Sequence, residues 1–272
     1  MDTFHAFQLW SGGKDSTCSI VIENMYRLDL RFPPSSIVMA EVMFDNKRGI
    51  SGELPEHMEW VHTVAKPFFE SLGHRVEIRR SKKDYLDCFY RCIQSSKLHP
   101  ENVGRYQGFP LGGSCLVQRE CKLRTVKEIR QEYGAKSNVE ILGIAADEHK
   151  RLARLGRNKV SLLQMFGVNE VDTYSILKPY NLINPIYRRA RRGGCWFCPN
   201  QSYHQLSLLK KHRPDLWEEL KELSHVPNTV ARGFKWGESF ADVEAKVDRI
   251  LSLPEQEDMF RMEGGLSYDE VY

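Results

Sequence analysis

Apolar runs alternate with amphipathic stretches through the first half of the chain. The runs that predict strands lie at residues 4–10, 36–44, 74–78 and 139–145. The stretches that predict helices lie at 16–28, 56–72 and 83–93. Strands that alternate with helices favour βαβ units, in which a mostly parallel sheet carries helices on both faces. We therefore predict an α/β fold with a doubly wound, mostly parallel sheet.

The second half of the chain is less regular. Pro, Gly, Asn and aromatic residues at 95–115 predict a long loop, which we place at the active site because such loops are often functional. Helical periodicity returns at 205–223, where Pro214 interrupts or restarts the helix, and again at 239–253. We predict a nucleotide-binding α/β domain over 1–185 and a Cys-knuckle and helical region over 186–272, packed on the same site.

The most specific motif is Ser11-Gly12-Gly13-Lys14-Asp15-Ser16, which follows an apolar run and opens a predicted helix. Adjacent glycines let the backbone turn tightly, and a helix N-terminus offers unpaired N–H groups and a positive dipole to an anion. Lys14 adds a full charge, the two serines add hydroxyl donors, and Asp15 can cap the helix or support a phosphate-bound Mg²⁺. The spacing differs from the GxxxxGK[ST] loop. We predict a phosphate cradle, for which a purely structural turn is the alternative.

Seven cysteines are better explained as metal ligands or core residues than as disulfides, because we expect a reducing compartment. Cys195 and Cys198 form a CxxC knuckle flanked by Gly193-Gly194 and Pro199, and a second pair, Cys115 and Cys121, follows Gly112-Gly113. Four thiolates fit zinc or an iron–sulfur cluster. Alternatively, the second pair belongs to the core and the knuckle is a zinc staple or a redox pair. Burial in the core is expected for the other three, Cys18, Cys88 and Cys92.

Composition places the chain among soluble globular proteins, with 41% hydrophobic and 28% charged residues. No apolar run approaches the ~20 residues that span a bilayer, and the first five residues lack a signal region, so we expect a cytoplasmic protein without membrane contact. The net charge is only +3, but basic residues cluster unevenly. The clusters are Arg188, Arg189, Arg191 and Arg192, and Lys150, Arg151, Arg154, Arg157 and Lys159. With Tyr187, Trp196 and Phe197 to stack on bases, they predict contact with a polynucleotide. A solvated basic face, or a site for the phosphates of ATP, is the alternative.

The SGGKDS motif resembles the PP-loop of the ATP pyrophosphatases, the superfamily that includes the phosphoadenylyl-sulfate (PAPS) reductases and several RNA and DNA sulfur-insertion enzymes. The resemblance implies an adenine nucleotide alpha hydrolase-like fold. It also implies that the loop holds the β,γ-pyrophosphate of ATP as leaving group while a substrate oxygen attacks the α-phosphorus. The GCxxCP knuckle with an upstream cysteine segment resembles the 4Fe-4S layout of sulfonucleotide reductases and of some PP-loop thiolation enzymes, although their first pair is adjacent.

Two more segments resemble this family. Phe44-Asp45-Asn46 is similar to a segment whose acidic residue lies near the adenosine, which implies a nucleotide contact for Asp45; a turn residue is the alternative. The segment from Gly143 to Arg151 resembles a glycine-led stretch that enters the site, and it implies nucleotide contacts for both of these residues. Ala145 stands where an arginine is usual and His149 where a serine is usual, which argues against a sulfated nucleotide.

Sulfonucleotide reductases carry their nucleophilic cysteine in a C-terminal Glu-Cys-Gly-Leu segment, where this chain has Glu263-Gly264-Gly265-Leu266 and no cysteine after Cys198. Without that thiolate no covalent S-sulfo intermediate forms. The leading hypothesis is therefore a PAPS reductase-family ATP pyrophosphatase that adenylylates a substrate, with a nucleic acid as the favoured acceptor, and assists sulfur transfer through a 4Fe-4S cluster. The alternatives are a sulfonucleotide reductase that uses an external thiol and a nucleotide-binding module with structural zinc.

The hypothesis assigns a role to each candidate residue. The residues expected to act in the reaction are Lys14, Asp15 and Ser16. Those expected to bind ATP are Ser11, Gly12, Gly13, Lys14, Ser16, Asp45, Gly143 and Arg151. Those expected to hold the metal are Cys115, Cys121, Cys195 and Cys198. The expected cofactors and partners are ATP, Mg²⁺, the cluster or zinc, an RNA or DNA acceptor and a sulfur-donor protein, and a second copy of the chain is compatible with them.

Overall fold

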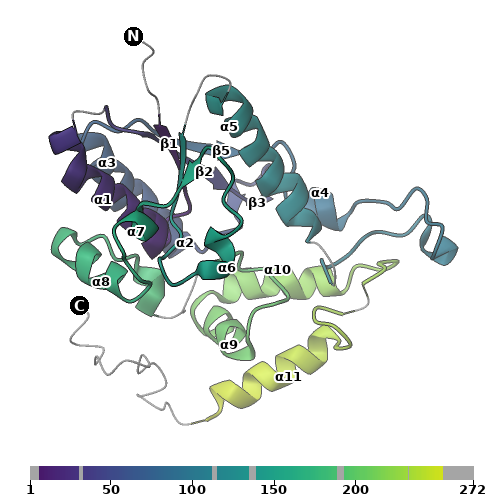
Figure 1. Cartoon of the computed structure of the whole chain (residues 1–272). Coiled ribbons are helices and arrows are strands. Elements are labelled where there is room, and N and C mark those ends of the chain that lie inside the picture. Colours follow the sequence, from purple (N-terminus) through teal and green to yellow (C-terminus); the bar gives the residue numbers. More distant parts are fainter. Residues whose placement is uncertain are drawn as a thin grey trace.

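A parallel sheet with the strand order β5-β2-β1-β6-β7 organises the chain (Figure 1). The structure is a computed structural model that describes residues 6–30, 33–111, 115–134, 139–188, 193–231 and 233–253. The strands are β1 (Ala6–Trp10), β2 (Ser36–Glu41), β5 (Val76–Arg80), β6 (Val139–Leu142) and β7 (Lys159–Val160). Each neighbouring pair runs parallel. The predicted doubly wound α/β fold is confirmed.

Alternating side chains on the central strands bury two different faces of the sheet. Ile37 and Met39 of β2 pack in one apolar cluster with residues of α1 (Lys14–Leu30) and α3 (Lys66–Ser71). Val38 and Ala40 point to the opposite face, where they pack with residues of α5 (Arg124–Gly134). This period of two is the property of a strand that is buried on both sides. It explains why the predicted strands are almost continuously apolar.

Several boundaries differ from the sequence-based expectation. The predicted strand 36–44 ends at Glu41, and its last part forms β3 (Met43–Asp45), which pairs antiparallel with β4 (Ile50–Ser51). The predicted helix 56–72 comprises α2 (Pro55–Trp60) and α3, which are joined by the π-helical turn Val61–Ala65. The helix α4 (Tyr85–Phe89) is shorter than predicted, because the chain leaves it to pair Cys92 with Tyr106.

The C-terminal helices begin where the sequence places their caps. They are α9 (Tyr203–His212), α10 (Pro214–Ser224) and α11 (Phe240–Leu251). Ser202 and Ser239 each form a capping box at the start of a helix, which satisfies orphan N–H groups. Pro214 begins α10 because a first-turn position needs no N–H partner, so the expected restart of the helix is confirmed.

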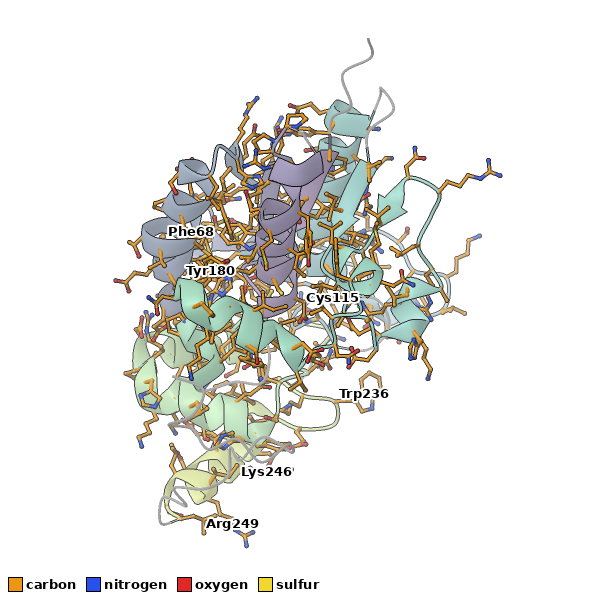
Figure 2. The ribbon with its side chains drawn as sticks, turned by 60° about the vertical axis from the view of Figure 1, so that its left-hand side comes forward. Phe68, Cys115, Tyr180, Trp236, Lys246 and Arg249 are labelled. Atoms are coloured by element: carbon orange, nitrogen blue, oxygen red, sulfur yellow. The ribbon has the colours of Figure 1, made fainter. Side chains whose placement is uncertain are left out.

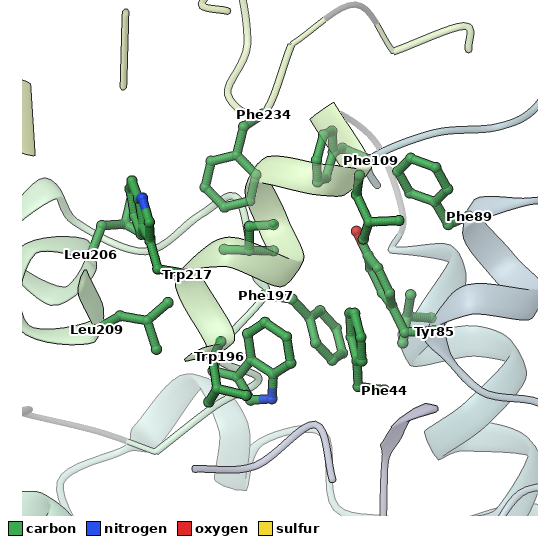
Figure 3. Close-up of a cluster of buried hydrophobic side chains, with 14 of the residues drawn as sticks. Phe44, Tyr85, Phe89, Phe109, Trp196, Phe197, Leu206, Leu209, Trp217 and Phe234 are labelled. Atoms are coloured by element: carbon green, nitrogen blue, oxygen red, sulfur yellow. The ribbon is translucent and has the colours of Figure 1, made fainter. Parts of the chain in front are cut away.

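A third apolar cluster joins the sheet region to the C-terminal helices (Figure 3). The ring of Phe44 lies 4.5 Å from that of Trp196, and the ring of Phe197 lies 4.1 Å from that of Tyr85. Trp196 and Phe197 are each only 2% exposed, and the indole N–H of Trp196 donates to the Ser51 carbonyl at 2.8 Å. The prediction that these two rings stack on bases is therefore wrong, because both rings are buried in the core.

The described part of the predicted 95–115 loop, residues 95–111, runs out to the side of the molecule and returns (Figure 1). Its 3-10 turn Pro100–Asn102 is exposed, and Tyr106 bridges to Thr229 beyond α10. Elsewhere on the surface, Trp236 projects from the C-terminal region and is 80% exposed (Figure 2). Within the described ranges, no helix combines the length and the apolar character needed to cross a membrane.

Candidate functional site

The Ser11–Ser16 loop lies at the carboxyl end of β1, between that strand and α1. From β1 the chain passes to β2 on one side, and β6 pairs with β1 on the other side. This reversal of strand order is the topological switch point at which open α/β sheets bind ligands. The loop and Gly143, which follows β6, both lie at this point. The structure thus brings together two segments that the sequence could only list separately.

The backbone of the loop is shaped by its own hydroxyl groups. Gly12 has a φ of +70°, a conformation that residues with a Cβ rarely adopt. Ser11 Oγ accepts from the Gly13 N–H at 3.3 Å and lies 3.1 Å from Ser16 Oγ. Ser16 Oγ in turn donates to the Gly13 carbonyl at 3.1 Å. The two serines therefore hold the turn, in addition to being able to meet an anion.

Gly143 allows β6 to approach the loop very closely. A Cβ at this position would lie 2.4 Å from Ser16 Cα and 2.5 Å from Ser16 N. These are backbone atoms at the start of α1, so they cannot swing away. The glycine is required by packing against the loop, and any contact with a nucleotide would be made by its backbone.

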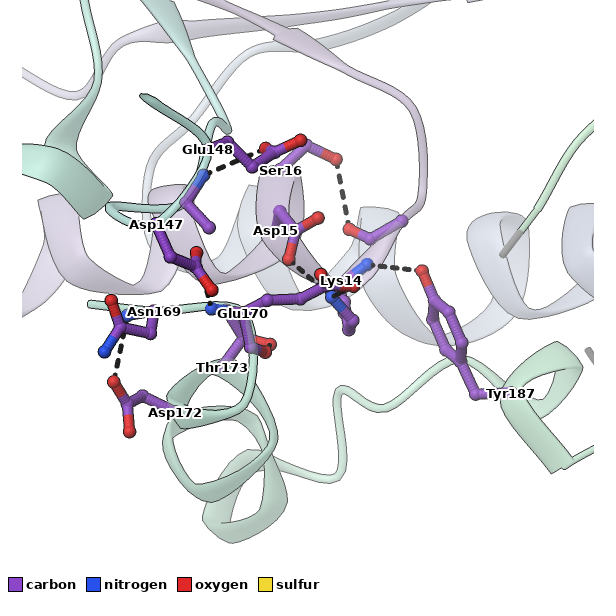
Figure 4. A network of polar contacts seen from close by, with 12 residues as sticks. Lys14, Asp15, Ser16, Asp147, Glu148, Asn169, Glu170, Asp172, Thr173 and Tyr187 are labelled. Atoms are coloured by element: carbon purple, nitrogen blue, oxygen red, sulfur yellow. Dashed lines mark hydrogen bonds and ion pairs between the residues drawn. The ribbon is translucent and has the colours of Figure 1, made fainter. Parts of the chain in front are cut away.

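Lys14 is buried in a network of charged groups (Figure 4). Its Nζ donates to Asp15 Oδ1 and to Glu170 Oε1, both at 2.8 Å. Burial alone would lower the pKa of Lys14, but the ion pairs outweigh it and raise the pKa above its ordinary value. Burial raises the pKa of Asp15, against the opposing effect of Lys14. The ammonium is therefore a permanent positive charge at the N-terminus of α1.

Asp45 and Arg151 make contacts that differ from their expected role. Asp45 Oδ1 accepts from the Lys47 N–H at 2.8 Å, and its other oxygen pairs with Arg48 at 2.6 Å. The Arg48 hydrogen bond holds the pKa of Asp45 below its usual range. Arg151 is exposed and pairs with Glu148, whose carboxylate also accepts from the Ala145 N–H. In this structure Asp45 acts as the turn residue that was the alternative prediction.

The sequence analysis missed a buried histidine that lies against the loop. His57, on α2, is 2% exposed, and a Cβ on Gly12 would come within 2.6 Å of its Nε2. The Asn184 amide donates to His57 Nδ1 at 2.9 Å and to the Gly12 carbonyl at 3.3 Å. Nδ1 is thus an acceptor, which places the proton of the neutral ring on Nε2. Burial lowers the pKa of His57, which favours this neutral form.

A cavity of about 470 Å³ lies on the other side of His57. Three of the four candidate ligands line it, namely Cys115, Cys195 and Cys198. The cavity is also lined by His57 and by the cationic side chain of Lys122. His57 therefore contacts both the Ser11–Ser16 loop and the cavity that the thiols line, which no spacing in the sequence indicates.

The fourth candidate, Cys121, does not line this cavity. Its Sγ is buried 3.9 Å from the Sγ of Cys88, and both belong to the aromatic cluster. The two cysteines do not share a helix face, because Cys121 lies in the π-helical segment Gln118–Leu123 and Cys115 lies before it. Cys115 immediately precedes the helical segment and accepts from the Gln118 N–H at 3.4 Å, while Cys121 points to the core side. This placement differs from the predicted ligand set of four.

The knuckle itself is a well-supported turn. The Cys198 N–H donates to the Cys195 carbonyl at 3.0 Å, and the Gln201 amide donates to the Cys195 and Trp196 carbonyls. Burial raises the pKa of Cys195 well above its ordinary value, so only a bound metal or another cation would favour its thiolate. In the described part of the chain, no three His, Cys, Asp or Glu side chains are grouped closely enough to bind a metal ion.

Some predicted features lie outside the described residues: Gly112-Gly113, Arg189, Arg191, Arg192 and the segment Glu263-Gly264-Gly265-Leu266. Of the second basic cluster, Lys150, Arg154 and Arg157 are exposed, whereas Lys159 pairs with the buried Glu140 at 3.4 Å. An exposed basic surface therefore exists beside α6 (His149–Leu152).

Comparison with known proteins finds similarity among solved structures. No protein-family description matches the chain, and no curated protein matches it. Among solved structures, it is similar to the U34-tRNA thiolase NcsA from Methanococcus maripaludis, which was determined with its 4Fe-4S cluster. The identity is 15% and the TM-score 0.41, over 100% of this chain and 80% of the other. The chemistry of the site therefore has to follow from its own residues.

Proposed function

We propose that the chain is an ATP-using enzyme of the PP-loop type that adenylylates an acceptor in a sulfur-transfer reaction. The observation that carries the proposal is the Ser11–Ser16 loop at the switch point of the sheet, with Lys14 buried at its centre and a thiol-lined cavity beside it. A purely structural turn would not require a buried ammonium. Burying a charge is costly unless a bound or built-in anion compensates it.

The loop residues would act on the phosphates of ATP. The ammonium of Lys14 and the N–H groups of Gly13 and Lys14 would donate to the β- and γ-phosphates. An oxygen of the acceptor would attack the α-phosphorus while the bond to the pyrophosphate oxygen breaks, which leaves AMP on the acceptor. Charge develops on the leaving pyrophosphate, so fixed donors and Mg²⁺ at this place would lower the barrier.

The cavity thiols would hold the metal centre of this reaction. Cys115, Cys195 and Cys198 line one cavity from two segments, and sulfur ligands are the kind that an iron–sulfur cluster or zinc takes. In the described structure the three thiols are not close enough together to bind a metal ion, so the two segments would have to draw together around it. A cluster bound there would supply iron to which sulfur can attach. Lys122, which lines the same cavity, would offset the negative charge of the thiolates. The neutral His57 ring, with its proton on Nε2, would lie between the Ser11–Ser16 loop and the cavity thiols.

The acceptor class that we propose is a nucleic acid. The exposed side chains of Lys150, Arg154 and Arg157 follow the same end of β6 as Gly143 does. They could contact phosphates of a polynucleotide while one nucleotide reaches the loop. The favourable charge would be screened by salt, so binding should weaken as the salt concentration rises.

The test is an anaerobic assay with Mg²⁺, ATP and candidate RNA or DNA, in which AMP and pyrophosphate are measured. The wild type should release pyrophosphate and leave AMP attached to the acceptor, and Lys14→Ala should lose this activity and the affinity for ATP. The matched control is Lys127→Ala, an exposed lysine on α5. An unchanged affinity for ATP in Lys14→Ala, with circular dichroism showing that it is folded, would refute the role of the loop.

A further inference from the structure

Side chains of the protein itself occupy the donors with which the loop would bind phosphate. Lys14 Nζ donates to Glu170, and the Lys14 backbone N–H donates to the Tyr187 hydroxyl at 2.9 Å. Both acceptors are oxygen atoms, which is also what a phosphate group would offer to these donors. Figure 4 shows Glu170 and Tyr187 reaching Lys14 from different elements.

The two acceptors come from far along the chain. Glu170 is 156 residues and Tyr187 is 173 residues from Lys14. Glu170 lies just before α8 (Asp172–Leu177), and Tyr187 lies in the 3-10 turn Pro185–Arg188. Contacts between residues so far apart in the sequence form only when the chain adopts its tertiary structure. It is therefore different in kind from the contact with the neighbouring Asp15.

The two groups differ in exposure, because the Glu170 side chain is exposed whereas Tyr187 is half-buried. The Glu170 side chain is 57% exposed, so its carboxylate can turn into solvent, where it loses little. Tyr187 packs its ring edge against Tyr174, with 6.0 Å between centroids, and only its hydroxyl touches the loop. The Tyr187 hydroxyl also lies close to Gly13, because a Cβ on Gly13 would lie 3.3 Å from the hydroxyl oxygen.

We propose that Glu170 and Tyr187 set the affinity of the loop for nucleotide, because a triphosphate must displace both of them from Lys14 in order to bind. This inference rests on the proposed function, in which the loop binds the phosphates of ATP. Without nucleotide, the two groups keep the buried ammonium and the backbone N–H satisfied, which avoids the cost of unpaired donors. With nucleotide, a carboxylate beside the triphosphate would repel it. Anions of low charge would therefore displace Glu170 and Tyr187 from Lys14 poorly.

The arrangement also links the loop to the thiol cavity. Asn184 donates to the Gly12 carbonyl, and Tyr187 accepts from Lys14. Between them, Pro185 and Ile186 line the cavity with the cysteines. A displacement of Tyr187 that also moves its turn would therefore change the cavity wall.

The test is calorimetric titration of the full chain with α,β-methylene ATP, which cannot be cleaved at the α–β position, with and without Mg²⁺. Glu170→Gln keeps the shape and removes the charge, so without Mg²⁺ it should bind about tenfold more tightly than the wild type. Tyr187→Phe removes one hydrogen bond and should bind about threefold more tightly. The control is Glu128→Gln, a 64% exposed glutamate on α5, which should match the wild type.

Equal or weaker binding by Glu170→Gln without Mg²⁺ would overturn the inference. Weaker binding only with Mg²⁺ would also overturn it, because Glu170 would then support the metal instead of competing with phosphate. A titration in which the wild type and all variants fail to bind would refute the proposed function itself. Binding by the wild type that Lys14→Ala loses would leave the proposed function standing, whatever Glu170→Gln does.

Discussion

Replacing Gly143 by alanine should push strand β6 away from the start of helix α1. The added Cβ would lie 2.4 Å from Ser16 Cα, 2.5 Å from Ser16 N and 2.7 Å from the carbonyl carbon of Asp15. Carbon atoms that are not bonded prefer separations of about 3.5 Å or more, so relief of the clash needs a shift of about 1 Å. All three atoms belong to the backbone, and therefore the loop and the first turn of α1 would have to move together.

Both stability and nucleotide binding should respond to this shift. Overpacking a close contact costs about 1–3 kcal/mol, so we expect the free energy of unfolding to fall by about 2 kcal/mol. For a chain of this size, that loss corresponds to a decrease of about 3–4 °C in Tm. Because a displacement of about 1 Å at a site can cost up to about 100-fold in function, we expect the affinity for α,β-methylene ATP to fall at least about tenfold.

Urea unfolding and calorimetric titration would measure the two effects. The matched control is Gly156→Ala, because a Cβ at Gly156 has no atom within 4 Å and its φ is not positive. The control should keep the stability and the affinity of the wild type. If Gly143→Ala also kept both, the close approach of β6 to the loop would not be a determinant of the site, and the packing argument would be refuted.

Three further predictions concern the thiols, the buried histidine and the turn that joins them. Cys195→Ser should lose most of the bound iron or zinc and Cys121→Ser should keep it, as measured by metal analysis of anaerobically purified protein; equal losses would contradict the assignment of the cavity thiols. Burial lowers the pKa of His57 below 6.5, so the unfolded state binds more protons and stability falls as the pH decreases below that value, by at most about 1.4 kcal/mol per pH unit. Urea titrations at about pH 7.5 and about pH 5.5 should show that the free energy of unfolding falls less between the two values in His57→Gln than in the wild type. An identical fall would argue against the buried neutral ring. Tyr187→Phe should weaken the effect of nucleotide on the alkylation rate of Cys195, followed by mass spectrometry, whereas an undiminished effect would show that the turn does not connect the two sites.

Local signals in the sequence were enough to predict much of the fold. The apolar run before Ser11 and the glycines after it mark the boundary between β1 and α1, since both the strand and the tight turn depend on neighbouring residues. Pro214 likewise marks the start of α10, because proline acts on its own backbone. The position of the Ser11–Ser16 loop was therefore available from the sequence. The break in the second predicted strand was not, because Val42 is as buried as Glu41 and Met43 on either side of it.

The composition of the site was decided by the tertiary structure. Spacing placed Cys121 beside Cys115, but the direction of the helical segment turns Cys121 toward Cys88. The aromatic residues of a CxxC knuckle can face solvent or the core, and here Trp196 faces the core, where it packs on Phe44.

The sequence by itself thus determined where the loop, the helix starts and the strands lie, because loop, cap and strand signals are properties of short stretches of chain. Only the tertiary structure decided which side chains meet there. Glu170 and Tyr187 reach Lys14 across more than 150 residues, and contacts at such a separation depend on how the whole sheet and its connections are arranged. No local pattern records that arrangement.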